Sequence, residues 1–218
     1  MLKTGPIVTV SPVSRDNLKI RPLKKSDISS IVEMHIIAFP GFFMTLMGKR
    51  FLVEYYNTVF DYEYSINLIA TNNSGESVGF AVGFKDPTKF YKFLKSRFYN
   101  FITPTIYGFL RQPHLILKIF MGFVRVNNKK IIIENDSSCE LSSIGAIKQG
   151  LGCGSSLLKQ FIEEARIKNS SEIILTTDMN NNDNVVKFYI SNGFTQADIE
   201  NRGNRPMIKF IFTLNDIS

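Results

Sequence analysis

Apolar and polar positions alternate or recur along most of the chain, and their period changes between segments. The run Leu18–Leu23 alternates like a short edge strand, and Ser26 or Asp27 after it can cap a helix with apolar residues at helical spacing. We therefore expect folding to start at Leu18, after a tail over residues 1–17. The elements expected next are a helix over Phe43–Phe60 and a hairpin of two strands, Asn67–Thr71 and Val78–Phe84.

The segment Lys85–Lys130 has a different pattern, because basic and aromatic residues dominate it. It holds ten Lys or Arg and ten Phe or Tyr residues but a single acid, Asp86. Its apolar positions recur at helical spacing with lysines largely on the other side, which predicts a basic amphipathic helix, and a second one is expected after Pro104 and Pro113. The apolar positions of the first helix are Phe90, Phe93, Leu94, Phe98 and Phe101.

Beyond this segment, regular strand and helix patterns return. The elements expected are a strand over Ser138–Ile147, a glycine turn, a helix over Ser155–Lys168, a strand over Glu172–Thr177, a helix over Asn184–Asn192 and a strand over Pro206–Leu214. The basic segment is therefore interpreted as an insertion into a chain of otherwise ordinary elements.

Composition narrows the class of protein. The chain has 218 residues, 44% of them hydrophobic and 21% charged, which suits one globular domain with an insertion. With only Cys139, Cys153, His35 and His114, a disulfide framework or a four-ligand zinc site is disfavoured, so we expect no metal and a reduced, cytoplasmic setting. The chain shows no leader and no apolar run of about 20 residues, which favours a soluble protein.

The net charge of +7 is unevenly distributed. Residues 85–130 alone carry +9, so the rest of the chain is nearly neutral. Any anionic partner that the total charge suggests is therefore expected at the insertion.

Glycines cluster in the turn between the strand Ser138–Ile147 and the next helix. Gly150, Gly152 and Gly154 let the backbone approach a ligand, and a helix start presents unpaired N–H groups that favour an anion such as phosphate. The spacing fits neither a Walker loop nor the Gly-x-Gly-x-x-Gly of a dinucleotide fold. From the glycines alone, an anion site and a turn that binds nothing are both open.

Two motifs resemble those of one known family. The turn Gln149–Gly154 is similar to the Gln/Arg-x-x-Gly-x-Gly/Ala signature of the Gcn5-related N-acetyltransferases. The segment Asn182–Phe194 is similar to their Asn-x-x-Ala-x-x-Phe-Tyr-x-x-x-Gly-Phe pattern, with Val185 in place of the usual Ala. Both motifs occur in the family's order. The resemblance covers residues 18–84 and 138–214, whereas the insertion has no counterpart in the minimal family fold.

The resemblance implies a fold, a reaction and a cofactor. The fold is α/β, with a mixed, mostly antiparallel central sheet flanked by helices, in a single domain over residues 18–214 that carries the helical insertion. The reaction is direct attack of a primary amine on acetyl-CoA, whose arm lies between the strand ending near Ile147 and the strand Glu172–Thr177. The residues implied to bind the cofactor are Ile144, Gly145, Ala146, Ile147, Gln149, Gly150, Leu151, Gly152, Cys153, Gly154, Ser155, Asn182 and Tyr189.

The resemblance also implies a general acid. Tyr189 stands at the family's position for the acid that protonates the departing thiolate, and the alternative is an ordinary core tyrosine. Asn182 is implied to bind the cofactor arm, or else it simply starts a helix. An acyl-cysteine route through Cys153 is disfavoured, because no Cys–His pairing is visible in the sequence.

The general base is less defined. Glu140 is the candidate, because strand alternation places its carboxylate on the face of Ser142 and Ile144, near where family members often carry a base. A solvated strand-end acid is an equal alternative. Glu33, His35 or a water relay are the other candidates for the base.

The insertion has three interpretations. It forms a lid or wall of the acceptor site, it lies on anionic lipid as a peripheral membrane contact through residues 85–130, or, least favoured, it binds nucleic acid. The lid interpretation adds a substrate wall made by His35, Phe39, Phe42 and Phe43.

The acceptor is expected to be a small-molecule amine, for example an amino sugar or a nucleotide-linked sugar. The alternatives are a module that binds the cofactor without turnover and a membrane-surface acyltransferase. Either a monomer or a homodimer is compatible with the sequence.

Overall fold

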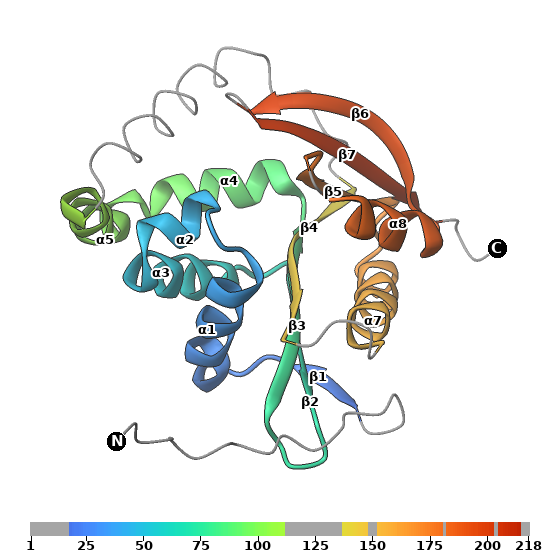
Figure 1. Ribbon diagram of the computed structural model, residues 1–218, viewed down its shortest axis with the longest axis horizontal. Helices are drawn as coiled ribbons and strands as arrows, with labels where there is room; N and C mark the ends of the chain where they lie inside the picture. Colours follow the sequence, from blue (N-terminus) through green and yellow to red (C-terminus); the bar gives the residue numbers. More distant parts are fainter. Residues whose placement is uncertain (1–17, 112–136, 148–151, 181, 203–204, 215–218) are drawn as a thin grey trace, which may run out of the picture.

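A seven-stranded sheet separates two layers of helices (Figure 1). The structure is a computed structural model and describes residues 18–111, 137–147, 152–180, 182–202 and 205–214. The strands are β1 (Lys19–Pro22), β2 (Ser65–Thr71), β3 (Ser77–Lys85), β4 (Ser138–Ala146), β5 (Glu172–Asp178), β6 (Thr195–Arg202) and β7 (Arg205–Thr213). The helices are the 3-10 turn η2 (Lys25–Asp27), α1 (Ile28–Ala38), α2 (Phe43–Met47), α3 (Lys49–Phe60), α4 (Pro87–Ser96), α5 (Phe98–Arg111), α7 (Cys153–Ile167) and α8 (Asp183–Ser191).

The strand order is β1-β2-β3-β4-β5-β7-β6, and every neighbouring pair is antiparallel except β4 and β5. The predicted fold class, a mixed and mostly antiparallel sheet flanked by helices, is therefore confirmed.

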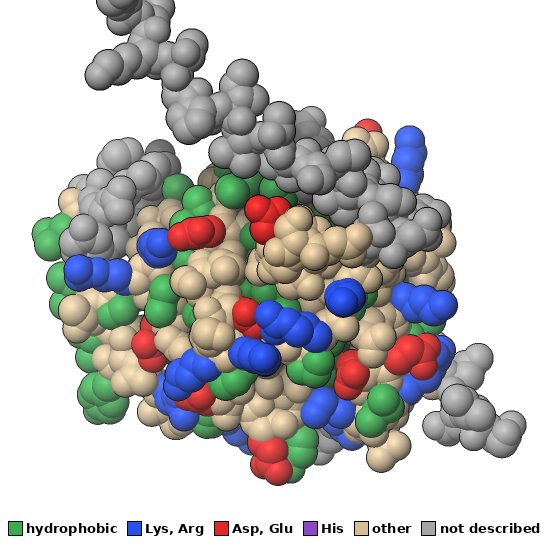
Figure 2. Space-filling model, turned by 90° about the horizontal axis from the view of Figure 1, so that it is seen from below, with side chains coloured by type: hydrophobic (Ala, Val, Ile, Leu, Met, Phe, Trp, Pro, Cys, Tyr) green, Lys and Arg blue, Asp and Glu red, His purple; other side chains and the backbone are tan. Residues whose placement is uncertain are grey.

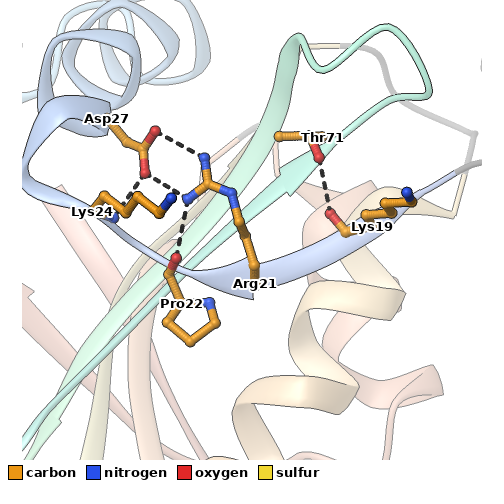
Figure 3. Close-up of polar contacts among 6 residues, drawn as sticks. All are labelled: Lys19, Arg21, Pro22, Lys24, Asp27 and Thr71. Atoms are coloured by element: carbon orange, nitrogen blue, oxygen red, sulfur yellow. Dashed lines mark hydrogen bonds and ion pairs between the residues drawn. The ribbon is translucent and has the colours of Figure 1, made fainter.

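The connection between β1 and α1 is held by one carboxylate (Figure 3). Arg21 donates to both carboxylate oxygens of Asp27, at 2.7 and 2.9 Å, and the backbone N–H of Lys24 donates to the same group at 2.7 Å. The guanidinium of Arg21 is the main reason that the pKa of Asp27 lies below its ordinary value. Asp27, one of the two predicted caps, thus ties β1 and the following turn to the start of α1.

One face of the sheet, the α7 face, is covered by α7 and α8. Its core combines α7 with the sheet, and Tyr189 of α8 belongs to it. The fully or nearly fully buried α7 side chains are Leu157, Leu158, Phe161, Ile162 and Ala165, as their spacing predicts.

The opposite face, the α3 face, is covered by α1, α3 and the insertion helix α4. Phe90 of α4 stacks on Phe84 of β3 at 3.7 Å between ring centroids, and Phe101 of α5 meets Phe51 of α3 at 5.3 Å. The described part of the insertion therefore contributes Phe90 and Phe101 to this core, whereas Phe98 and Tyr99 are exposed.

Two helix predictions were wrong in their boundaries. Gly48, with a φ of 92° in the left-handed range, divides the helix expected over 43–60 into α2 and α3. The insertion helix expected through Phe101 ends before Arg97, and a new helix, α5, runs on through Pro104. The bend lets Phe90 and Phe101 reach partners on different elements. The second expected helix, after Pro113, lies outside the described residues.

Strand β6 was missed by the sequence prediction. It is an edge strand paired only with β7 within the described residues, and its side chains are mostly exposed, so it lacks an alternating apolar pattern.

The outer surface carries both kinds of charge. On the face in Figure 2, Lys and Arg side chains are interspersed with Asp and Glu. The insertion exposes Lys92 and Lys95 on α4 together with Tyr99 and Leu110 on α5. In the part of the chain that the structure describes, no helix is long and apolar enough to cross a bilayer. Peripheral membrane contact stays a prediction.

Candidate active site

Strands β4 and β5 part after a short paired stretch. They pair only over Ser138–Glu140 and Glu172–Ile174, whereas β4 continues beside β3 to Ala146 and β5 continues beside β7 to Asp178. The facing edges beyond Glu140 therefore do not pair with each other, and their main-chain groups can bond an extended ligand. This parting lies where the sequence prediction placed the wedge.

A bulge at Ser142 changes which way the side chains of β4 point. Ser143 pairs with Val82 and Leu141 with Gly83, so Ser142 is the additional residue on β4. The hydroxyl of Ser142 lies 2.6 Å from the hydroxyl of Tyr55 on α3, while Ile144 packs against the α7 core. The prediction that Glu140, Ser142 and Ile144 share one face was therefore wrong for Ile144.

The start of α7 has the geometry of an anion site. Gly152 precedes it with a φ of 75° in the left-handed range, and no side chain among the described residues caps the helix or adds an acid to its first turn. The first N–H groups, on Cys153, Gly154 and Ser155, have no acceptor within the helix and lie at its positive end. The predicted Gln149, Gly150 and Leu151 lie outside the described residues.

A cavity of about 470 Å³ adjoins this helix start. It lies between α7, the end of α8 and β7. Its two basic lining residues among those described, Lys159 and Arg166, come from α7. The lining residues are Gly152, Ser155, Ser156, Lys159, Ile162, Glu163, Arg166, Asn192 and Phe212. Lys159 is the lining cation nearer to the unpaired N–H groups, because Arg166 lies in the last turn of α7 and pairs with Glu163 at 2.6 Å.

Cys153 is unsuited to nucleophilic chemistry. Its side chain is buried, and a Cβ added at Gly79 of β3 would lie 2.6 Å from its sulfur. Burial raises the pKa of the Cys153 thiol to about 11, so it carries its proton at neutral pH. The close contact with Gly79 indicates a packing role.

Tyr189 lies in α8 and is 6% exposed, surrounded by the rings of Phe188, Phe194 and Phe210. Its hydroxyl makes no hydrogen bond to any described residue. Burial raises the pKa of Tyr189 well above its ordinary value, so the phenol keeps its proton at neutral pH. Tyr189 is therefore a core ring with a protonated hydroxyl, and its role as the general acid stays a prediction.

Asn182 caps the N-terminal end of α8. Its side-chain amide donates to Thr177 Oγ1 at 2.8 Å and to the carbonyl of Asp178 at 2.7 Å. These bonds tie α8 to the end of β5 and leave the amide oxygen as the acceptor that a ligand can use. Its role in binding a cofactor stays a prediction.

Glu140 is the last β4 residue paired with β5, and its carboxylate points to the α3 face. Tyr91 of α4 donates its hydroxyl to this carboxylate, at 2.9 and 3.1 Å from the two oxygens. Glu33, an alternative base, is instead a surface residue whose carboxylate accepts from Lys49 Nζ at 3.0 Å. The geometry favours Glu140 over Glu33.

His35 is buried, with 2% exposure, and is not an open wall residue. Its Nδ1 lies 2.6 Å from the hydroxyl of Tyr56, and its Nε2 has no partner among the described residues. Burial lowers the pKa of His35 to about 4, so the ring is neutral at pH 7. Tyr56 in turn hydrogen-bonds Ser143 of β4.

The other predicted wall residues are in aromatic contact. Phe39 packs against His35 and Phe42, with ring centroids 4.7 and 5.6 Å away, and Phe43 packs against Phe51 at 5.9 Å. These rings extend the aromatic packing of the α3 face.

Arg205 joins this aromatic row to the end of β5. Its guanidinium lies 4.6 Å from the ring centroid of Phe42, and its Nε donates to Asp178 Oδ2 at 3.0 Å. The sequence prediction missed this contact. The sequence shows that Arg205 and Asp178 are charged, but only the fold brings the two residues together.

No protein-family model and no curated protein matches the sequence. Solved structures do match in fold. An N-acetyltransferase from Staphylococcus aureus Mu50 aligns with a TM-score of 0.60 at 17% identity, over 91% of this chain and 99% of that one. A putative acetyltransferase of the GNAT family from Desulfovibrio desulfuricans aligns with a TM-score of 0.56 at 13% identity, over 90% and 98%. The fold is that of the Gcn5-related N-acetyltransferases.

A third match extends this similarity to a protein solved with a ligand. A putative acetyltransferase from Salmonella typhimurium, solved with its cofactor acetyl-CoA, aligns with a TM-score of 0.57 at 16% identity, over 93% of this chain and 96% of that one. The fold that the sequence resemblance implied is thus confirmed, and the matching chains align over nearly their full lengths.

Proposed function

We propose that this protein is an acetyl-CoA-dependent N-acetyltransferase that acts on a primary amine of a small molecule. The observation that carries the proposal is that β4 has an edge beyond Glu140 that does not pair with β5, and that no described side chain caps the start of α7, the next described helix. Glu140 offers a carboxylate and the helix start an anion site, as acetyl transfer to an amine from a phosphate-containing donor requires.

The described residues fit the cofactor. The N–H groups at the start of α7 would hold the pyrophosphate, and Lys159, two turns further along the same helix, would face the nucleotide end. The unpaired edge of β4 over Ile144–Ala146 would bond the amides of the cofactor arm as a further strand would. When bound, acetyl-CoA would supply the acetyl thioester.

The chain's own side chains would handle the protons. The carboxylate of Glu140 would accept the proton that the acceptor amine gives up, and the hydroxyl of Tyr189 would supply one to the departing sulfur. A neutral phenol is required for the second role, and a tyrosine is neutral at pH 7 with its ordinary pKa, which burial raises further in Tyr189. The thiol of Cys153 stays protonated, which favours direct attack over an acyl-cysteine route.

Calorimetric titration with acetyl-CoA tests the cofactor, and release of free thiol in the presence of amino sugars, polyamines, amino acids and peptides tests the reaction. We expect binding, and thiol release with at least one amine. No binding at high micromolar acetyl-CoA contradicts the proposal, whereas binding without turnover favours the alternative of a non-catalytic module.

Tyr189→Phe tests the general acid. Because the variant removes only the hydroxyl, we expect turnover to fall about 100-fold with little change in acetyl-CoA affinity. Tyr64→Phe, at a partly exposed position, is the matched control. Unchanged turnover in Tyr189→Phe would remove this residue as the acid.

A further inference from the structure

Tyr91 connects the insertion to the candidate base. It belongs to α4, in the segment without a counterpart in the minimal family fold, and its hydroxyl lies within hydrogen-bond distance of both oxygens of Glu140. The two residues are 49 positions apart in sequence. This bond directly links the described part of the insertion to the edge where β4 and β5 part.

The ring of Tyr91 is anchored although about half of its surface is exposed. It meets Phe84 and Phe90 at 5.9 and 5.5 Å between centroids, and Phe84 is the residue that pairs with Glu140 across β3 and β4. The register that sets the position of Glu140 therefore also sets the position of Tyr91. The hydroxyl is thus held at the carboxylate by packing, which makes the bond well oriented before any substrate arrives.

We propose that Tyr91 is a positioning residue that orients the Glu140 carboxylate toward the acceptor amine. This inference rests on the proposed function. A phenol O–H that donates to a carboxylate stabilises the charged form and thereby lowers the carboxylate's pKa. The insertion would then support the reaction through one hydrogen bond, in addition to packing on α3.

Other titratable groups near Glu140 come from several elements. Tyr55 of α3 interacts electrostatically with it, and Cys139 is its neighbour on β4. Lys89 of α4 is paired with Asp86, and Lys85 at the end of β3 donates to the carbonyl of Lys168 at 2.7 Å. The bond from Tyr91 is a direct contact to the carboxylate, and a conservative substitution can remove it.

Tyr91→Phe keeps the ring and removes the hydroxyl. We expect the acidic limb of the kcat/KM profile to move up by about one pH unit and kcat at neutral pH to fall about tenfold, with unchanged acetyl-CoA affinity. Glu140→Gln should lower kcat more strongly, and adding Tyr91→Phe to it should cause no further loss, because the two residues act as one unit. Tyr99→Phe, an exposed tyrosine of α5, is the matched control.

A measurement that needs no turnover separates this inference from the proposed function. With carboxyl-labelled glutamate, NMR titration reads the pKa of Glu140 directly, and we expect it to rise by about one unit in Tyr91→Phe but not in Tyr99→Phe. An unchanged pKa overturns the positioning role even if the wild type is an active enzyme. A failure to bind acetyl-CoA would count against the enzyme proposal alone.

Discussion

The two faces of the sheet are built differently. The α7 face is an almost wholly apolar core in which α7 lies directly on the strands, with Phe161 against Gly83. The α3 face combines aromatic packing with buried polar contacts, in which Tyr55 meets Ser142 and Tyr56 meets His35.

This difference shows how the two halves of the candidate site are specified. On the α7 face, the candidate cofactor groups are main-chain N–H groups at one helix start, which need small residues and close packing. On the α3 face, the candidate acceptor groups are side chains from separate elements that only the fold brings together, such as Tyr91 and Glu140. The α7 face therefore tolerates little added side-chain volume. The α3 face depends on hydrogen bonds between its buried polar side chains.

The largest expected effect is steric and falls on the α7 face. A Cβ at Gly83 would collide with the carbonyl oxygen of Glu140 and lie 2.6 Å from the ring of Phe161, so we expect Gly83→Ala to lower the free energy of unfolding by more than about 3 kcal/mol. Gly145→Ala, on the α1-covered side, meets Phe80 at 3.0 Å and should cost about 1 kcal/mol. Urea unfolding measures both, and equal costs would contradict a tighter α7 face.

The next effect is a pH dependence that belongs to the α3 face. The folded-state pKa of His35, about 4, lies below its ordinary value of 6.5, so the unfolded chain binds the proton first as the pH falls. Above pH 6.5, His35 is neutral in both the folded and the unfolded state, so its titration does not lower the free energy of unfolding. As the pH falls toward 4, this free energy should decrease by up to about 3 kcal/mol.

His35→Gln removes this titration, so its unfolding free energy should depend less on pH across the same window. Urea unfolding at several pH values compares it with the wild type. Parallel curves for the two proteins would show that His35 does not titrate as its burial requires.

The smallest effect compares two buried tyrosines. Tyr56→Phe leaves His35 Nδ1 and the hydroxyl of Ser143 without their partner, which should cost about 2 kcal/mol. Tyr189→Phe removes a hydroxyl with no hydrogen bond to the described residues and should change stability by less than about 0.5 kcal/mol. Thermal unfolding measures both. The reverse order would mean that the polar contacts of the α3 face do not stabilise it.

Much of the α7 half could be predicted from the sequence. The glycine turn, the helix after it and the segment ending in Phe194 are contiguous motifs, and α7 buries Leu157 and Phe161 as helical spacing predicts. The parting of β4 and β5 was also expected, although only through the family resemblance.

On the α3 face, the sequence predicted which residues belong to the candidate site but not which of them contact one another. Glu140 and the wall residues were named, but the orientation of Ile144 was wrong, because strand alternation takes no account of a bulge. Tyr91 was read only as part of a helix, since nothing local pairs it with a strand residue 49 positions away. Strand β6 was missed because an exposed edge strand needs no apolar alternation.

The sequence by itself determined most of the elements, the charge of the insertion and the helix start that can hold an anion, because these depend on neighbouring residues. Only the tertiary structure decided which side chains meet. Ser142 reaches Tyr55, 87 positions away, because the fold packs α3 on this face of β4, and the extra residue in β4 turns Ile144 to the α7 core. Tyr91 reaches Glu140 because the insertion helix packs on β3 beside the residue that pairs with Glu140.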